Sequence, residues 1–132
     1  MIKVENVEKS YGNEKVLNGV SLTIEDGEFV SIMGESGSGK STLLSIMGGF
    51  LMPDCGQVLW NGENIHNFSE SKMSALRCTE LGFVFQAFKL IPTLNIKDNL
   101  LLPTILGKKV DERTYKYLDE LTKKLQGTED EY

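Results

Sequence analysis

The chain has 132 residues and a formal net charge of −5, with 25% charged and 40% hydrophobic residues. This composition is typical of a soluble globular domain, and the negative charge argues against a nucleic-acid-binding surface. No apolar run reaches the roughly 18 residues that a membrane span needs, and the N-terminus lacks the apolar core of a signal peptide.

Two alternating strands are predicted before residue 28. Apolar residues at Ile2, Val4 and Val7 alternate with polar ones, which is typical of a half-buried strand. A second strand follows, with Val20, Leu22 and Ile24 on one face and a turn at Asp26-Gly27. The two strands are expected to be antiparallel.

The next stretch predicts a strand, a glycine-rich loop and a helix. Residues 28–34 are rich in β-branched and aromatic side chains, and the helix is expected to end at Gly48-Gly49. The loop between them fits G-x-x-x-x-G-K-[ST], the pattern of a phosphate-binding loop. The candidate nucleotide-binding residues are Gly34, Glu35, Ser36, Gly37, Ser38, Gly39, Lys40, Ser41 and Thr42.

Each residue type in this loop has a physical reason to be there. Glycines let the backbone fold so that successive N–H groups converge on an anion, and a helix starting at the loop adds its positive end. Lys40 is expected to reach the outer phosphates, and the Ser41 hydroxyl to bind Mg²⁺. The alternative is an ordinary glycine-rich turn that joins a strand to a helix.

The sequence after Gly49 predicts a hairpin, a helix, a strand and two further helices. Asn61-Gly62 is a favoured two-residue hairpin turn, and Ser69 or Ser71 is expected to cap a helix that runs to about Leu81. Residues 82–86 are expected to form a buried strand, and residues 95–107 and 111–127 to be helical. In the last helix, one face is expected to carry Tyr117, Leu118, Leu121 and Leu125, and Gly127 to stop it.

The only histidine and the two cysteines carry little chemistry. With His66 alone, a histidine-rich metal site is excluded, and we expect His66 to be a solvated loop residue. Cys55 and Cys78 form no C-x-x-C pair, so we expect reduced thiols in a cytosolic protein, with a disulfide as the alternative.

Other classes of phosphate-binding protein fit less well. A GTPase needs N-K-x-D, whereas residues 95–98 read N-I-K-D, and no D-x-x-G occurs. A dinucleotide-binding fold needs G-x-G-x-x-G, whereas the loop reads G-x-x-G-x-G and carries Lys40 and Ser41. A small-molecule P-loop kinase stays open on the loop alone, although strands ahead of the loop are unexpected there.

From its first strand to about Gly107, the chain resembles the N-terminal part of an ABC-transporter ATPase domain. The resemblance rests on the approach to the loop in residues 16–44 and on "GFVFQAFKLIPTLNIKDNL" in residues 82–100, which resembles the Q-loop region. The amino-acid sequence of this region is most similar to that of ATPases of lipoprotein release, macrolide export and antimicrobial-peptide export. The resemblance implies an α/β P-loop core with antiparallel strands before the loop.

The resemblance also implies roles and partners. Tyr11 lies where that family stacks an aromatic ring on adenine, with a surface tyrosine at a strand end as the alternative. Gln86 would contact Mg²⁺ and the attacking water of bound ATP, and would link the site to a membrane permease. The protein would then lie in the cytoplasm, on the inner face of the membrane, and would act with a second ATPase domain.

The chain departs from the family pattern in what it lacks. The sequence has no L-S-G-G-Q signature, Walker B strand or switch histidine, and residues 115–120, "YKYLDE", have helical spacing with an interrupting Lys116. Residues 1–132 are therefore expected to be the N-terminal, truncated part of one such domain. We expect weak Mg-ATP binding without hydrolysis by this chain alone.

Two alternative functions and one assembly property complete these expectations. The chain could instead be a non-catalytic module that docks on a permease, or a small-molecule kinase. Because a sheet without its later strands exposes unpaired backbone groups, we also expect self-association through the sheet edges.

Overall fold

The computed structural model describes residues 1–87, 89–107 and 111–126. These fall into two compact units, Met1–Met73 and Ser74–Tyr132, and each unit is described by itself. Within the described residues, no helix has the length and apolar character needed to cross a membrane.

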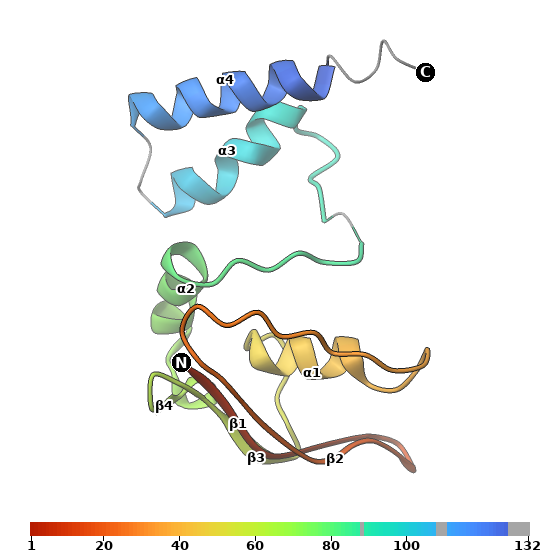
Figure 1. The fold of residues 1–132 in the computed structure, drawn as a ribbon. Helices are drawn as coiled ribbons and strands as arrows, with labels where there is room; N and C mark the ends of the chain where they lie inside the picture. Colours follow the sequence, from red (N-terminus) through yellow and green to blue (C-terminus); the bar gives the residue numbers. More distant parts are fainter. Residues whose placement is uncertain (88, 108–110, 127–132) are drawn as a thin grey trace. The chain divides into compact units, whose positions relative to one another are not determined.

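The first unit is built on a four-stranded antiparallel sheet (Figure 1). Its strands are β1 (Ile2–Tyr11), β2 (Glu14–Ile24), β3 (Cys55–Trp60) and β4 (Glu63–Asn64), in the order β2-β1-β3-β4. The predicted opening pair of antiparallel strands is thus confirmed. So is the hairpin turn, because Asn61 and Gly62 adopt φ angles of 48° and 86° between β3 and β4.

A bulge in β2 decides which of its residues face the core. Val7 of β1 pairs with Val20 of β2, whereas Lys9 pairs with Leu17. Between these two pairs, β2 contains one more residue than β1. Gly19 lies in the bulge with φ 70°, a conformation that suits glycine. The extra residue shifts the alternation of β2, so Leu17 is buried although it lies out of step with Val20 and the later inward residues.

The core of the first unit lies between the sheet and helix α1 (Lys40–Met47). Its members are buried apolar side chains: Val4, Val7, Leu17, Leu43, Ile46, Met47, Val58, Ile65 and Met73. The helix ends at Gly48, as its sequence predicts, and Gly49 follows with φ 69°. The short 3₁₀ helix η1 (Ile65–Asn67) then leads to helix α2 (Glu70–Thr79), whose first turn Ser69 caps through a hydrogen bond from the Lys72 N–H.

The second unit contains helices α3 (Ile96–Leu106) and α4 (Glu112–Gln126), which confirms the two predicted C-terminal helices. Leu101 of α3 and Leu118 of α4 are buried, and an ion pair of 2.7 Å joins Lys97 to Asp119. The approach to α3 is fixed by Asn99, whose amide accepts from the Ile91 N–H and donates to three backbone carbonyls. "YKYLDE" lies within α4, so its assignment to a helix is confirmed.

Two predicted strands are wrong. Residues 28–34 and 82–86 are described, and neither forms a strand. Phe29 is 94% exposed and Val84 is 97% exposed, so neither segment is buried. Both have the near-continuous apolar pattern of a strand that is covered on two faces, and such a strand forms only where neighbouring backbones pair with it. No other described segment pairs with either one.

The predicted apolar face of α4 is also partly wrong. Leu118 is buried and Leu121 half-buried, but Tyr117 is 63% exposed. Tyr117 is adjacent in sequence to Leu118 and therefore lies about 100° around the helix from it. The side chain of Leu125 and the predicted stop at Gly127 lie outside the described residues. Cys55 and Cys78 are free thiols, as expected.

Candidate functional site

The glycine-rich loop is shaped by two glycines with left-handed backbone angles. Gly37 has φ 82° and Gly39 has φ 89°. At Gly39 a β carbon would also lie 2.9 Å from side-chain atoms of Val16 and Leu17 in β2 and 3.0 Å from the Val16 carbonyl oxygen. Position 39 therefore needs glycine for its backbone angle and for the close approach of β2. This contact seats the loop on the β1–β2 hairpin.

Helix α1 starts with its first amide groups free of capping partners. Its N-cap is Gly39, which has no side chain to cap it, and no acidic residue lies in the first turn. The first helical bond runs from the Leu43 N–H to the Gly39 carbonyl. The N–H groups of Lys40, Ser41 and Thr42 make no backbone hydrogen bond to another described residue. Free N–H groups and the helix dipole together favour an anion at this end of α1.

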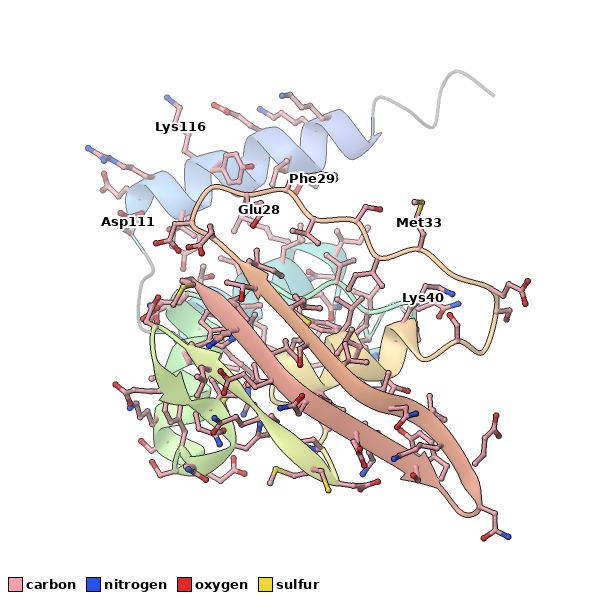
Figure 2. The ribbon with its side chains drawn as sticks, turned by 60° about the horizontal axis from the view of Figure 1, so that its bottom comes forward. Glu28, Phe29, Met33, Lys40, Asp111 and Lys116 are labelled. Carbon is pink, nitrogen blue, oxygen red and sulfur yellow. The ribbon has the colours of Figure 1, made fainter. Side chains whose placement is uncertain are left out.

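The ammonium group of Lys40 lies folded over the loop that precedes it. Its Nζ atom donates to the carbonyl oxygens of Gly34 at 2.7 Å and Glu35 at 2.5 Å, and to Ser38 Oγ at 3.1 Å. Figure 2 shows the Lys40 side chain beside the loop. The loop carbonyls thus hold a positive charge next to the free amides of α1. An anion at the helix end would meet both.

Gly34 and Ser38 set the width of the loop. A turn joins them, with the Ser38 N–H donating to the Glu35 carbonyl at 3.2 Å. A β carbon at Gly34 would come within 2.6 Å of Ser38 Oγ, so a larger residue at position 34 would displace the hydroxyl that contacts Lys40. The pattern G-x-x-x-x-G-K-[ST] identified Gly34, but the contact between Ser38 and Lys40 was missed because that position is unspecified in it.

The remaining loop residues lie at the surface. Glu35, Ser36 and Ser41 are exposed, and Thr42 is half-buried in the first turn of α1. The structure thus brings the nine predicted residues from Gly34 to Thr42 together at one helix end.

Tyr11 lies at the tip of the hairpin on which the loop is seated. It ends β1, pairs with Glu14 of β2, and is 51% exposed, so its ring is accessible. The Lys9 ammonium lies 5.9 Å from the ring centroid. Val16 and Leu17, which contact the loop at Gly39, follow Glu14 in β2. The hairpin tip and the loop therefore belong to one packed assembly in the first unit. The sequence pattern missed Leu17 because the bulge at Gly19 changes the alternation.

Gln86 lies in the second unit and is exposed in an irregular segment. Two aromatic rings precede it, those of Phe83 and Phe85, with centroids 4.7 Å apart. The predicted strand that would have presented Gln86 is absent. Its assignment to the metal and to the attacking water stays a prediction.

The residues suggested for Mg²⁺ have suitable donor atoms. Ser41 offers a hydroxyl oxygen and Gln86 an amide oxygen, and Mg²⁺ prefers oxygen ligands with phosphates supplying the rest. Within the described part of the chain, no group of three or more His, Cys, Asp or Glu residues could hold a metal ion by itself. The Ser41 hydroxyl is the kind of oxygen ligand that suits Mg²⁺ held together with phosphates.

His66 differs from its prediction as a solvated loop residue. It is half-buried in η1, and its Nε2 atom lies 3.2 Å from the Leu51 carbonyl oxygen. Burial lowers the pKa of His66, because it disfavours the charged imidazolium, while hydrogen bonds with backbone carbonyls oppose this effect. The ring is therefore part of the packing between η1 and the end of α1.

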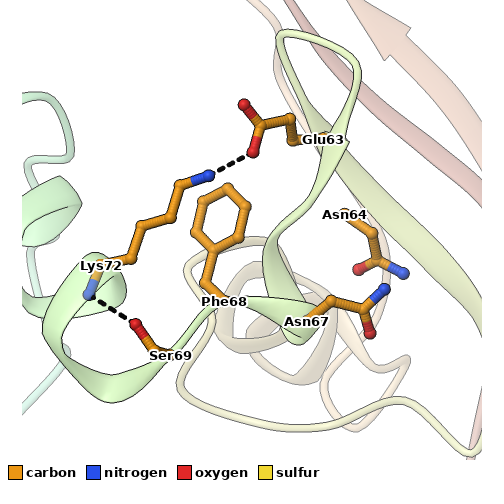
Figure 3. A pocket seen from close by; sticks show the side chains of 6 residues that line it. All are labelled: Glu63, Asn64, Asn67, Phe68, Ser69 and Lys72. Atoms are coloured by element: carbon orange, nitrogen blue, oxygen red, sulfur yellow. Dashed lines mark hydrogen bonds and ion pairs between the residues drawn. The ribbon is translucent and has the colours of Figure 1, made fainter.

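A shallow pocket of about 340 Å³ lies beside β4 and α2 (Figure 3). It is lined by Glu63, Asn64, Asn67, Phe68, Ser69 and Lys72. The Lys72 ammonium forms an ion pair with Glu63 and lies 3.8 Å from the centroid of the Phe68 ring. Its charge is thus already matched, unlike that of Lys40, whose partners are uncharged.

Comparisons with known proteins agree with the family that the motifs resemble. A profile of the ABC transporter family matches residues 17–131. The ABC transporter ATP-binding protein YknY of Bacillus subtilis is 44% identical over 92% of this chain and 56% of its own length. The lipoprotein-releasing system ATP-binding protein LolD of Bacteroides thetaiotaomicron is 41% identical over 89% and 56%. The macrolide export ATP-binding/permease protein MacB of Chlorobaculum tepidum is 45% identical over 86% and 18%.

A solved structure shows the same similarity in three dimensions. The dimeric structure of the ATP-binding cassette MJ0796, in a post-hydrolysis state with ADP and Pi, aligns with a TM-score of 0.81 and 40% identity. The alignment covers 91% of this chain and 55% of that one. The chain thus spans about half the length of YknY, of LolD and of the MJ0796 chain.

Proposed function

Because the chain belongs to the ABC transporter family of ATP-binding proteins, we propose that its loop binds the phosphates of Mg-ATP. The observation that carries this proposal is the juxtaposition of the uncapped first turn of α1 with the Lys40 ammonium. The free amides would hold the inner phosphate oxygens and Lys40 the outer ones, while Ser41 would ligate Mg²⁺. The cradle residues are those from Gly34 to Thr42.

We propose that the adenine base of ATP stacks on the ring of Tyr11. Its exposed ring at the hairpin tip offers a flat aromatic face, and the contact of β2 with Gly39 keeps that tip in the same packed unit as the loop. An adenine ring stacks on such a face without needing specific hydrogen bonds. The cofactors proposed for this chain are accordingly ATP and Mg²⁺.

The proposed role is that of an ATP-binding subunit of an ABC transporter that drives export through a membrane permease. Two relatives support it by name, since LolD belongs to a lipoprotein-releasing system and MacB to macrolide export. In this role the protein would lie at the inner face of the membrane, bound to its permease, and would meet a second ATPase domain. We assign residues 1–132 to the N-terminal part of one ATPase domain.

We further propose that this 132-residue chain binds ATP weakly and does not hydrolyse it alone. Its sequence contains no L-S-G-G-Q and no apolar strand that ends in the acidic pair of a Walker B motif. Hydrolysis in P-loop enzymes depends on positioned groups that secure the metal and orient the water.

Titration calorimetry with Mg-ATP tests the proposed site. We expect weak binding by the parent chain and none by Lys40→Ala, because the variant lacks the charged partner of the outer phosphates. Lys72→Ala is the matched control, since this lysine belongs to the same unit but is paired with Glu63. Equal affinity of the Lys40 variant and the parent, or no binding by the parent, would contradict the proposal.

Two alternative functions, a permease-docking module and a small-molecule kinase, predict different results for the same purified chain. A module that only docks on a permease would be retained by the cognate permease whether or not Lys40 is intact. A small-molecule kinase would transfer the terminal phosphate of ATP to an acceptor, which phosphorus NMR would detect.

A further inference from the structure

The end of strand β1 is held from one side by Asp54, the residue that precedes β3. Beyond the last paired residues of the two strands, Glu8 and Cys55, the Asp54 N–H donates to the Glu8 carbonyl at 2.8 Å. The Asp54 carboxylate then takes the place of a backbone partner, because its Oδ2 atom accepts from the Ser10 N–H at 2.7 Å. The strand edge next to Tyr11 is thus fixed by a side chain.

The second oxygen of this carboxylate binds Lys9. The Lys9 Nζ atom donates to Asp54 Oδ1 at 2.8 Å, and the Lys9 side chain is only 15% exposed. The hydrogen bonds from the Lys9 ammonium and the Ser10 N–H hold the pKa of Asp54 below its ordinary value, so the carboxylate is charged at neutral pH. The bound ammonium lies over the Tyr11 ring, 5.9 Å from its centroid. One carboxylate therefore holds both the backbone before Tyr11 and the cation over its ring.

The Tyr11 ring has freedom that strand pairing does not remove. Tyr11 is the last residue of β1, pairs with Glu14 of β2, and is half-exposed. An exposed side chain of this kind occupies several rotamers, and a base that stacks on it must restrict them. Binding is tighter when the side chain is already held in the bound orientation before the ligand arrives.

We propose that Asp54 is a positioning residue for the base of the bound nucleotide, because it holds Lys9 over one face of the Tyr11 ring and leaves the other face to adenine. This inference rests on the proposed binding of ATP with its base on Tyr11. Asp54 acts through Lys9 and through the backbone at Ser10, and not by contact with the nucleotide.

A purely structural role of Asp54 makes a different prediction. Strands β1 and β3 are already paired from Ile2 with Trp60 to Glu8 with Cys55, and the buried side chains of the core lie under this pairing. If Asp54 only joined the two strands, its loss would weaken the unit as a whole and would affect the phosphates and the base of a ligand alike. A positioning role affects the base alone.

Calorimetric titration with two ligands separates these roles. Magnesium tripolyphosphate has the phosphates of ATP without its base, so it reports on the loop alone. We expect Asp54→Asn to weaken Mg-ATP binding at least about fivefold, the lower end of the loss of a base–aromatic stack, and to leave tripolyphosphate binding unchanged. Glu8→Gln is the matched control, because it removes the same charge from the same sheet and its carboxylate pairs with Lys15. It should change neither affinity.

The outcomes distinguish this proposal from the proposed function. Equal weakening of both ligands by Asp54→Asn, or no weakening of either, would overturn the positioning role and leave ATP binding intact. Binding of neither ligand by the parent would overturn the proposed function and the positioning role with it. In a Tyr11→Ala background, Asp54→Asn should have no further effect on ATP affinity, because the ring through which it acts is gone. A fivefold loss in that background would also overturn the positioning role.

Nuclear Overhauser effects in the ligand-free chain test the geometry without any nucleotide. We expect contacts between the Lys9 ε-methylene protons and the Tyr11 ring protons in the parent and in Glu8→Gln, and their loss in Asp54→Asn. A dispersed amide spectrum of each variant confirms that it is folded. Contacts that persist in Asp54→Asn would show that Lys9 keeps its place without the carboxylate, and would overturn the proposal.

Discussion

Gly39 of the phosphate loop and Val16 of β2 are in such close contact that a β carbon at position 39 would lie 2.9 Å from the Val16 side chain. This contact makes the β1–β2 hairpin the base on which the loop rests. Residues that were predicted separately, a strand and a glycine motif, thus form one structural element.

Replacement of Gly39 should therefore cost more stability than replacement of Gly37. Both glycines have left-handed φ angles, but a β carbon at Gly37 would meet no atom within 4 Å. We expect Gly37→Ala to lower the free energy of unfolding by about 1 kcal/mol through backbone strain alone. Gly39→Ala should lose a further 1–3 kcal/mol or so from the clash with β2. Urea denaturation measures both, and equal losses would show that the contact with Val16 relaxes freely.

Tyr11→Ala should weaken Mg-ATP binding by about 1–3 kcal/mol, the range for loss of a base–aromatic stack. Tyr11→Phe is the control, because it keeps the aromatic face and removes only the hydroxyl. Calorimetric titration of both variants provides the comparison. An affinity unchanged by the alanine substitution would return Tyr11 to an exposed residue at a strand end.

The stability of the first unit should fall as the solution is acidified below about pH 6.5, the ordinary pKa of histidine. The lowered pKa of His66 means that the folded chain binds this proton more weakly than the unfolded chain does. The unfolded state then gains protons first, so the histidine contribution is complete above the unfolded pKa and is lost as pH falls through the folded pKa. Thermal unfolding between pH 7.5 and 5.5 should show a smaller pH dependence for His66→Gln than for the parent. Identical slopes would assign the acid sensitivity to other groups.

The purified chain should release no phosphate from Mg-ATP above the blank. Loss of a positioned catalytic group typically costs a factor of about 10² to 10⁴, and the sequence lacks more than one such group of the family. A coupled phosphate assay over several hours is sufficient. Steady release that Lys40→Ala eliminates would reveal an acidic residue that serves in place of the Walker B pair.

Elements held by local contacts were predictable from the sequence. The Asn61-Gly62 turn, the Ser69 cap and the end of α1 at Gly48 depend on a few neighbouring residues, and all three are confirmed. The strands predicted at residues 28–34 and 82–86 would need hydrogen bonds with backbone segments far away in sequence. Neither strand forms in the described residues. Apolar pattern alone states what a strand requires but not whether a neighbour is present.

In the candidate site, too, features that depend on neighbouring residues were predicted, and features that depend on distant packing were missed. The motif located Gly34, Gly39, Lys40 and Ser41, because phosphate binding restricts those positions. The support from Leu17 could not be foreseen, since it follows from a bulge at Gly19 that changes the alternation of β2. The burial of His66 was also missed, because it results from packing of η1 and not from any local pattern.

We propose that the uncapped start of α1 and the Lys40 ammonium together bind the phosphates of ATP. Amide chemical shifts of the nitrogen-15-labelled chain, followed while Mg-ATP is added, test it residue by residue. We expect the largest saturating shifts at the N–H groups of Gly39, Lys40, Ser41 and Thr42. These shifts should disappear in Lys40→Ala but persist in Lys72→Ala. Absence of shifts at these four amides under saturating Mg-ATP, or shifts that survive in Lys40→Ala, would contradict it.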